Sequence, residues 1–125
     1  MTRDEVMALS DEELNDKAID LAGWEYEDEL SMTLRQGWHH REFGYRGTKP
    51  DYPHDIAAAM DLWEAMAQYH RVFHLCGPLS PPAAGWRIDQ EEQYDLVALS
   101  WGETPSLTIT RAFVIISTGG ADASK

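Results

Sequence analysis

Residues 38–49 have the greatest chemical potential in the sequence, because cationic and aromatic side chains alternate there. The candidate ligand-binding residues are Trp38, His39, His40, Arg41, Tyr45, Arg46 and Lys49, with Phe43 and Tyr52 nearby in the chain. Arginine donates paired hydrogen bonds to phosphate or carboxylate, and aromatic faces stack on nucleobases. The segment therefore predicts a site for a nucleotide or another phosphorylated small molecule. The alternative is a hairpin whose aromatic residues pack together and whose cations pair with acidic residues near the N-terminus.

The charge of the chain is large, negative and unevenly distributed. The formal net charge is −12, and residues 1–30 hold eleven acidic side chains against two basic ones. This excess argues against non-specific binding to nucleic acid or to an anionic membrane. Acids such as Asp11, Glu12 and Asp16 predict a second function, in which an acidic helix binds a basic protein. The alternative is that these acids favour solubility and helix N-termini.

No pattern in the sequence predicts catalysis, a metal site or a cofactor. His70 and His74 are four residues apart, but a strand expected from Val72 breaks the helical geometry that a shared metal requires. Cys76 precedes Gly77 at an expected strand end, where a cysteine is more often buried than nucleophilic. Phosphate-loop, dinucleotide and zinc-protease motifs are absent from the sequence. We therefore expect a protein that is not an enzyme.

The length of 125 residues predicts a single domain over residues 1–117 and a flexible tail over 118–125. One cysteine cannot form an internal disulfide, which is typical of a reducing compartment. The first residues are acidic where a signal peptide needs an apolar core, and no apolar run is long enough for a membrane span. These features predict a cytoplasmic protein.

Helical spacing predicts a turn near residues 3–8, a helix over 11–22 and a long central helix within residues 52–71, whose regular part begins at His54-Asp55. Ser10 is expected to cap the second of these, and Gly23 to end it. The apolar stripe expected on the central helix comprises Ile56, Ala59, Met60, Trp63, Met66 and Ala67. Residues 24–50 are compatible with a hairpin, for which Gln36-Gly37 is the candidate turn, or with a partly mobile loop.

The second half of the chain predicts strands over residues 72–76, 86–89 and 94–101, with the last two forming an antiparallel pair. Strict alternation in the last strand would place Leu99 on the face opposite Ser100. Residues 106–117 suit a strand by propensity, yet Thr104 and Pro105 form a helix start signal. The fold class expected is α/β (α+β), with a small antiparallel or mixed sheet.

Four stretches resemble the phage ABA sandwich domain family of small bacteriophage and prophage proteins. They are MTRDEVMAL at the start, LAGWE after the first long helix, Tyr52-x-x-Asp55-Ile56-Ala57-Ala58-Ala59, and GETPSLTITRAFVII near the end. The resemblance covers residues 1–27 and 51–117 and implies an α-β-α sandwich-like domain with about three helices. It also favours a helix for the last element. Pro53 replaces a serine of the family pattern, and residues 28–50 are longer and more basic than that pattern.

Taken together, these features predict a non-enzymatic phage accessory protein that acts by binding in the bacterial host cytoplasm. Its ligand would be a phosphate-bearing small molecule, such as a nucleotide signal of bacterial defence, which the protein sequesters as counter-defence. The alternative is an acidic protein–protein inhibitor of a basic host protein. A homo-oligomer is expected, since Trp63, Trp86 and Trp101 exceed what one small core needs.

Overall fold

The last helix, α4 (Pro105–Ser117), is the centre of the fold in the computed structural model, which describes residues 1–28, 36–69, 71–80 and 85–119. The Thr104 side chain caps the helix by accepting a hydrogen bond from the Leu107 amide at 3.2 Å, and Pro105 occupies the first turn. Nine of its thirteen residues are buried. Burial against neighbouring elements therefore outweighs the strand propensity of its β-branched residues, and the helix implied by the resemblance is confirmed.

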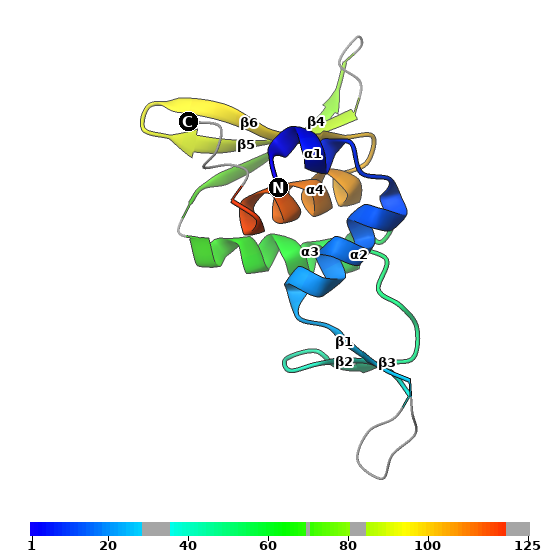
Figure 1. Ribbon diagram of the computed structural model, residues 1–125. Coiled ribbons are helices and arrows are strands. Elements are labelled where there is room, and N and C mark those ends of the chain that lie inside the picture. Colours follow the sequence, from blue (N-terminus) through cyan, green and yellow to red (C-terminus); the bar gives the residue numbers. More distant parts are fainter. Residues whose placement is uncertain (29–35, 70, 81–84, 120–125) are drawn as a thin grey trace.

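One antiparallel sheet covers α4 and has the strand order β4-β5-β6 (Figure 1). Its strands are β4 (Phe73–Leu79), β5 (Gly85–Glu92) and β6 (Asp95–Gly102), so the three predicted strands are confirmed with longer bounds. A bulge interrupts the β5–β6 pairing, because Ile88 pairs with Ser100 whereas Asp89 pairs with Ala98. Leu99 is the extra residue, and it is buried like Ser100. The predicted alternation is wrong at this point because a bulge adds one residue to one strand.

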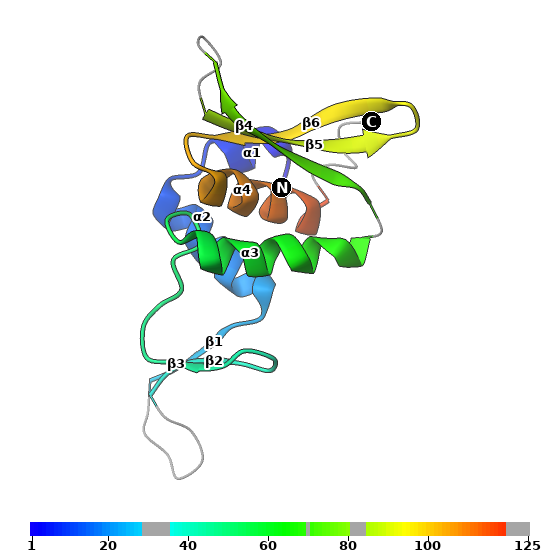
Figure 2. The same ribbon diagram turned by 180° about the vertical axis from the view of Figure 1, so that it is seen from behind.

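The other helices lie on the same side of this sheet as α4 (Figure 2). They are α1 (Arg3–Met7), α2 (Asp11–Ala22) and α3 (Ile56–Ala65), and all three pack against α4. The fold class is α+β, as expected. The layers run from the sheet through α4 to α2 and α3, so the described helices do not cover both faces of the sheet.

Helix α3 is shorter than predicted, and only part of its predicted apolar stripe faces inward. The Asp55 side chain caps the helix by accepting a hydrogen bond from the Ala57 amide at 3.0 Å, so residues 52–54 precede the helix. A 3-10 turn over Met66–Tyr69 follows its last residue. The buried residues of α3 and this turn are Ala58, Ala59, Leu62 and Met66. Ile56 and Met60 of the predicted stripe are 48% and 41% exposed. Small alanine side chains allow α3 to approach α4 closely, which explains why this face is buried.

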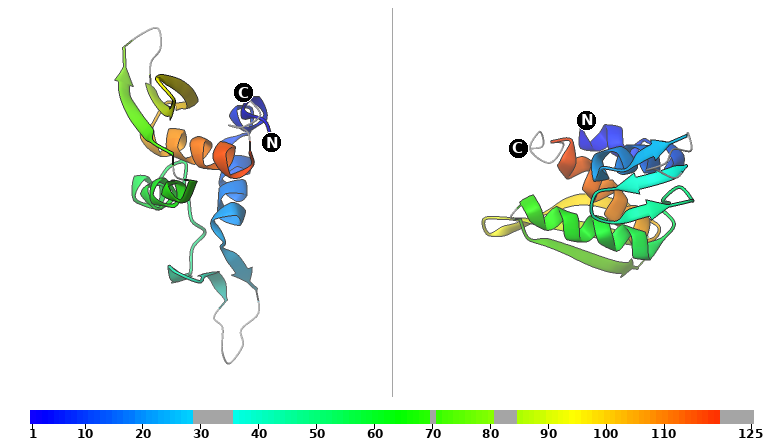
Figure 3. Two further views of the ribbon diagram at one scale, coloured as in Figure 1. Left: turned by 90° about the vertical axis from the view of Figure 1, so that its left-hand side faces the viewer. Right: turned by 90° about the horizontal axis from the view of Figure 1, so that it is seen from below.

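A second antiparallel sheet stands apart from the first, beyond the end of α2 (Figure 3). It comprises β1 (Glu25–Glu27), β2 (Gly37–His40) and β3 (Gly44–Arg46) in the order β1-β2-β3. A hairpin is present within residues 24–50 as β2 and β3, but its turn lies at residues 41–43, and Gly37 begins a strand instead of forming the expected turn. Three predictions concern residues outside the described part of the chain. They are the loop alternative for residues 29–35, the role of His70 and the flexible tail beyond residue 119.

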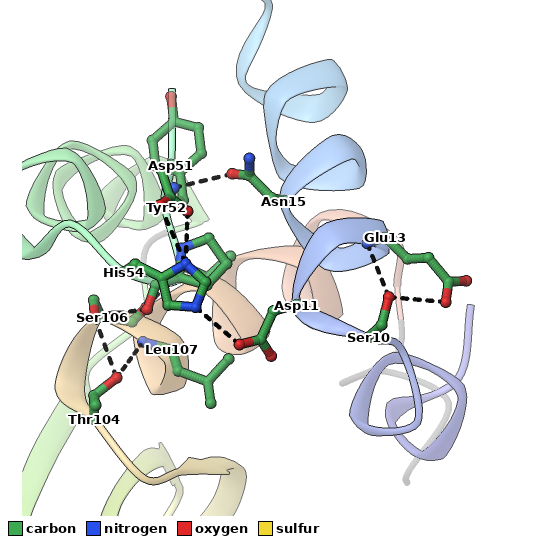
Figure 4. A network of polar contacts seen from close by, with 12 residues as sticks. Ser10, Asp11, Glu13, Asn15, Asp51, Tyr52, His54, Thr104, Ser106 and Leu107 are labelled. Atoms are coloured by element: carbon green, nitrogen blue, oxygen red, sulfur yellow. Dashed lines mark hydrogen bonds and ion pairs between the residues drawn. The ribbon is translucent and has the colours of Figure 1, made fainter. Parts of the chain in front are cut away.

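The chain between the small sheet and α3 is fixed by buried side chains of α2 and α4 (Figure 4). The Asn15 amide group donates to the Pro50 carbonyl at 2.8 Å and accepts from the Tyr52 amide at 2.9 Å. The Ser106 hydroxyl donates to the Pro53 carbonyl at 2.8 Å. Residues 50–53 are therefore held from both sides before α3 begins.

Candidate functional site

The predicted ligand-binding residues lie on two faces of the small sheet. Trp38 pairs with Arg46 across β2 and β3, and His39 pairs with Tyr45. Because successive side chains of a strand point to opposite faces, Trp38 and Arg46 share one face and His39 and Tyr45 share the other. The structure therefore does not bring the seven predicted residues together on one surface.

His40 fastens the small sheet to the end of α2. Its Nε2 lies 2.7 Å from the Ala22 carbonyl, and its Nδ1 accepts from the Glu42 and Phe43 amides at 2.9 and 3.2 Å. A carbonyl only accepts and an amide only donates, so a neutral ring with its proton on Nε2 satisfies all three contacts. The position of His40 is thus explained by its structural role.

The cations of the segment are distributed and partly engaged. Lys49 forms an ion pair with Asp16 of α2, as the alternative interpretation of this segment predicted. Arg41 lines a hollow of about 710 Å³ beside β2, and His39 and His40 line it too. Glu25 and Glu42 also line this hollow, so a phosphate bound there would face two carboxylates.

A second cavity, of about 430 Å³, lies where α2, the β2–β3 turn, α3 and α4 meet. We call it the seam cavity, because it joins the small sheet to the helices. Its lining residues are Leu21, Ala22, His40, Glu42, Phe43, Tyr52, Asp61, Leu62, Glu64, Ala65, Gln68 and Phe113. Two of the predicted site's neighbours in sequence, Phe43 and Tyr52, therefore belong to this cavity.

Aromatic rings form one wall of the seam cavity. Phe43 lies 4.6 Å from the His40 ring and stacks at 6.3 Å on Trp24, measured between ring centroids. The Trp24 Nε1 in turn donates a hydrogen bond to the Tyr52 hydroxyl at 2.8 Å. Phe43 remains 49% exposed, so its ring is accessible from solvent.

Three carboxylates from two elements line the same cavity: Glu42 from the β2–β3 turn, and Asp61 and Glu64 from α3. Within the described residues, none of these three carboxylates has a recorded hydrogen bond or ion pair. Asp61 and Glu64 are three residues apart, a spacing that makes two helical side chains neighbours. The seam cavity is therefore lined by three carboxylates that form no hydrogen bond or ion pair with the described chain, although the charge of Arg46 acts on the neighbouring Tyr52.

The acids of α2 contrast with those of the seam cavity because several are already bound. Asp11 accepts from the His54 Nε2 at 3.0 Å, and the His54 Nδ1 donates to Asp51 at 3.0 Å (Figure 4). Hydrogen bonds from both ring nitrogens favour the protonated imidazole, so Asp11 and then Asp51 raise the pKa of His54. Asp16 is paired with Lys49.

Tyr52 brings a buried hydroxyl to the seam cavity. Its side chain is 2% exposed, and its oxygen accepts the Trp24 hydrogen bond. Burial raises the pKa of the Tyr52 hydroxyl, the Trp24 hydrogen bond lowers it, and the nearby Asp61 carboxylate raises it again. The hydroxyl therefore keeps its proton. Among the described residues, this proton has no hydrogen-bond acceptor.

The remaining chemical candidates are engaged or dispersed. His74 lies in β4, where its Nε2 contacts the Glu91 carboxylate at 2.7 Å, and Cys76 lies half-buried in the same strand. Within the described ranges, no three histidine, cysteine or acidic residues are grouped so that they could hold a metal ion. Nor is any helix in these ranges long and apolar enough to cross a membrane.

Sequence reasoning missed the seam cavity and its three acids. The spacing of Asp61 and Glu64 on one helix was a usable signal, but their proximity to Glu42 depends on the fold. Comparison of the chain with known protein families, curated proteins and solved structures gives no match. The resemblance to the phage ABA sandwich family therefore stays a prediction.

Proposed function

We propose that this protein acts by binding, without catalysis, and that it engages a basic protein through the side that contains the seam cavity. The observation behind this proposal is the gathering of Glu42, Asp61 and Glu64 beside an accessible aromatic wall. Unpaired carboxylates attract a basic partner, and a net charge of −12 increases its rate of encounter. Exposed aromatic rings add contact area that is typical of binding surfaces.

This proposal keeps the acidic-inhibitor hypothesis and moves its contact surface. The sequence placed this contact on the acidic helix α2, but Asp11 and Asp16 already have basic partners within the chain, His54 and Lys49. The acids of the seam cavity have none in the described part. A basic host protein of a phage-infected cell would be such a partner if the family resemblance holds.

The phosphate-ligand hypothesis has less geometric support. Its residues occupy two faces of a sheet, and the hollow beside Arg41 contains two carboxylates. Sequestration of a nucleotide signal therefore remains a prediction from sequence, to be tested separately.

The test of the proposed function is a binding titration with a hexa-arginine peptide. Two variants remove the same charge: Asp61→Asn with Glu64→Gln at the seam cavity, and Glu12→Gln with Asp20→Asn on α2. We expect saturable, salt-sensitive binding that the first pair weakens more than the second, because the α2 acids lie outside the cavity. Equal weakening by both pairs would show general charge attraction and contradict the proposal.

A further inference from the structure

The seam cavity has properties that select one kind of basic group. Its volume of about 430 Å³ falls within the range of roughly 300–1,000 Å³ typical of ligand pockets. It is thus much larger than a single metal ion requires. A long side chain carrying a terminal cation would fill it better than a small inorganic ion.

The aromatic wall favours a flat cation over a round one. The Phe43 and His40 rings lie 4.6 Å apart and are tilted by 39°, with Phe43 half-exposed toward the solvent. Guanidinium is planar and weakly hydrated, so it stacks on such rings at lower desolvation cost than ammonium does.

The acids favour a group with many donors. Glu42 approaches from the β2–β3 turn, whereas Asp61 and Glu64 approach from α3. Guanidinium offers five N–H donors in a plane, and ammonium offers three on one atom. A guanidinium can therefore bond carboxylates on two sides of the cavity while its face rests on the aromatic wall.

The Tyr52 hydroxyl is a second, independent sign of a ligand. It is almost fully buried on a residue that lines the cavity, and its oxygen accepts a hydrogen bond from the Trp24 indole. That bond uses the hydroxyl as an acceptor only, so its proton stays available for an acceptor atom of a ligand. Guanidinium cannot accept a hydrogen bond, whereas the main-chain carbonyl beside an arginine can.

We propose that the seam cavity is a socket for one arginine side chain of a protein partner, with its guanidinium between Phe43 and the three carboxylates and an adjacent main-chain carbonyl on Tyr52. This inference rests on the proposed function and specifies its contact. It assigns to the partner an exposed arginine on a flexible segment or loop.

The experiment compares three probes by NMR titration of the isotope-labelled protein: Nα-acetyl-arginine amide, Nα-acetyl-lysine amide and agmatine, which has a guanidinium but no carbonyl. We expect the arginine amide to bind at least about tenfold more tightly than the lysine amide, with shifts at cavity residues. Asp61→Asn with Glu64→Gln should abolish this binding. Equal affinity for the arginine and lysine probes would overturn the socket.

Tyr52→Phe provides a test that separates binding from folding. The variant should weaken the arginine amide and leave agmatine unchanged, because agmatine never used the hydroxyl. Retained agmatine binding also shows that the cavity is still formed. If Tyr52→Phe binds both probes as tightly as the wild type, the carbonyl contact is wrong. Phe43→Ala should weaken the binding of both probes.

The outcomes distinguish this inference from the proposed function. If hexa-arginine binding depends on Asp61 and Glu64 but the arginine and lysine amides bind equally, the proposed function is supported and the arginine socket is wrong. If neither the peptide nor the arginine amide binds, both are wrong.

Discussion

The two sheets of this protein are held in place by different forces. The sheet β4–β6 rests on α4, whose residues Ile109, Val114 and Ile115 are fully buried, so apolar burial dominates there. The small sheet β1–β3 is attached at its edge by the contact of His40 with the Ala22 carbonyl and by the rings of His40 and Phe43 on Trp24. The sheet β4–β6 with helices α1–α4, which we call the body, should therefore lose structure under different substitutions from the small sheet.

The largest expected effect is on the body. Ile115→Ala should lower the free energy of unfolding by about 2–5 kcal/mol, because it leaves a cavity in the buried face of α4. Denaturant unfolding followed by circular dichroism measures this loss. Ile56→Ala is the matched control, since Ile56 is exposed on α3 and should cost little. A similar loss in both variants would contradict the central role of α4.

The next effect should be confined to the small sheet. His40→Ala removes the contacts to Ala22, Glu42 and Phe43 and should cost about 1–3 kcal/mol locally. Hydrogen exchange should then accelerate at β1–β3 amides while α4 amides stay protected. Equal acceleration of exchange in α4 would show that the two regions unfold together and would contradict their separate stabilisation.

A smaller, pH-dependent effect is expected at His54, which bridges α2 and the segment before α3. Asp11 and Asp51 raise its pKa above the ordinary 6.5, so its contribution is full below pH 6.5 and is lost as the pH rises through the folded-state value. His54→Gln should therefore destabilise the protein more at pH 6 than at pH 9. The difference should be about 1 kcal/mol or less, because the bridge is exposed. If His54→Gln lowers the free energy of unfolding equally at pH 6 and pH 9, His54 does not stabilise the protein as a charged bridge.

The smallest effect is expected from nucleotides. Binding to the native state would raise the melting temperature, and Arg41→Ala with Arg46→Ala would remove that rise. The division of residues 38–46 between two faces predicts little or no rise in the wild type. A clear rise that this double variant abolishes would restore the phosphate-ligand hypothesis and place function on the small sheet itself.

Local signals explain most of what the sequence predicted correctly. Ser10, Gly23 and Thr104 act within a few residues of themselves, so their roles as helix caps can be read from neighbouring positions. The bulge at Leu99 and the exposure of Ile56 and Met60 on α3 depend on packing between distant segments. Neither feature could be predicted from neighbouring positions for that reason.

The candidate site shows the same limit. The segment 38–49 stood out because its residue types are unusual, but strand alternation then separated them. The hydrogen bond between Trp24 and Tyr52 joins positions far apart in the chain, and only the fold brings Glu42 near α3. A site at a junction of elements has no single stretch of sequence from which it can be predicted.

The fastening of residues 50–53 by Asn15 and Ser106 has a consequence for how such a protein can diversify. Because the chain enters α3 from a fixed point, residues between Trp24 and Pro50 can change in length without shifting the register of the helices. We therefore expect the small sheet to tolerate replacement while the helices keep their positions. New partner preferences could arise by replacing that sheet while the core that folds the protein remains untouched.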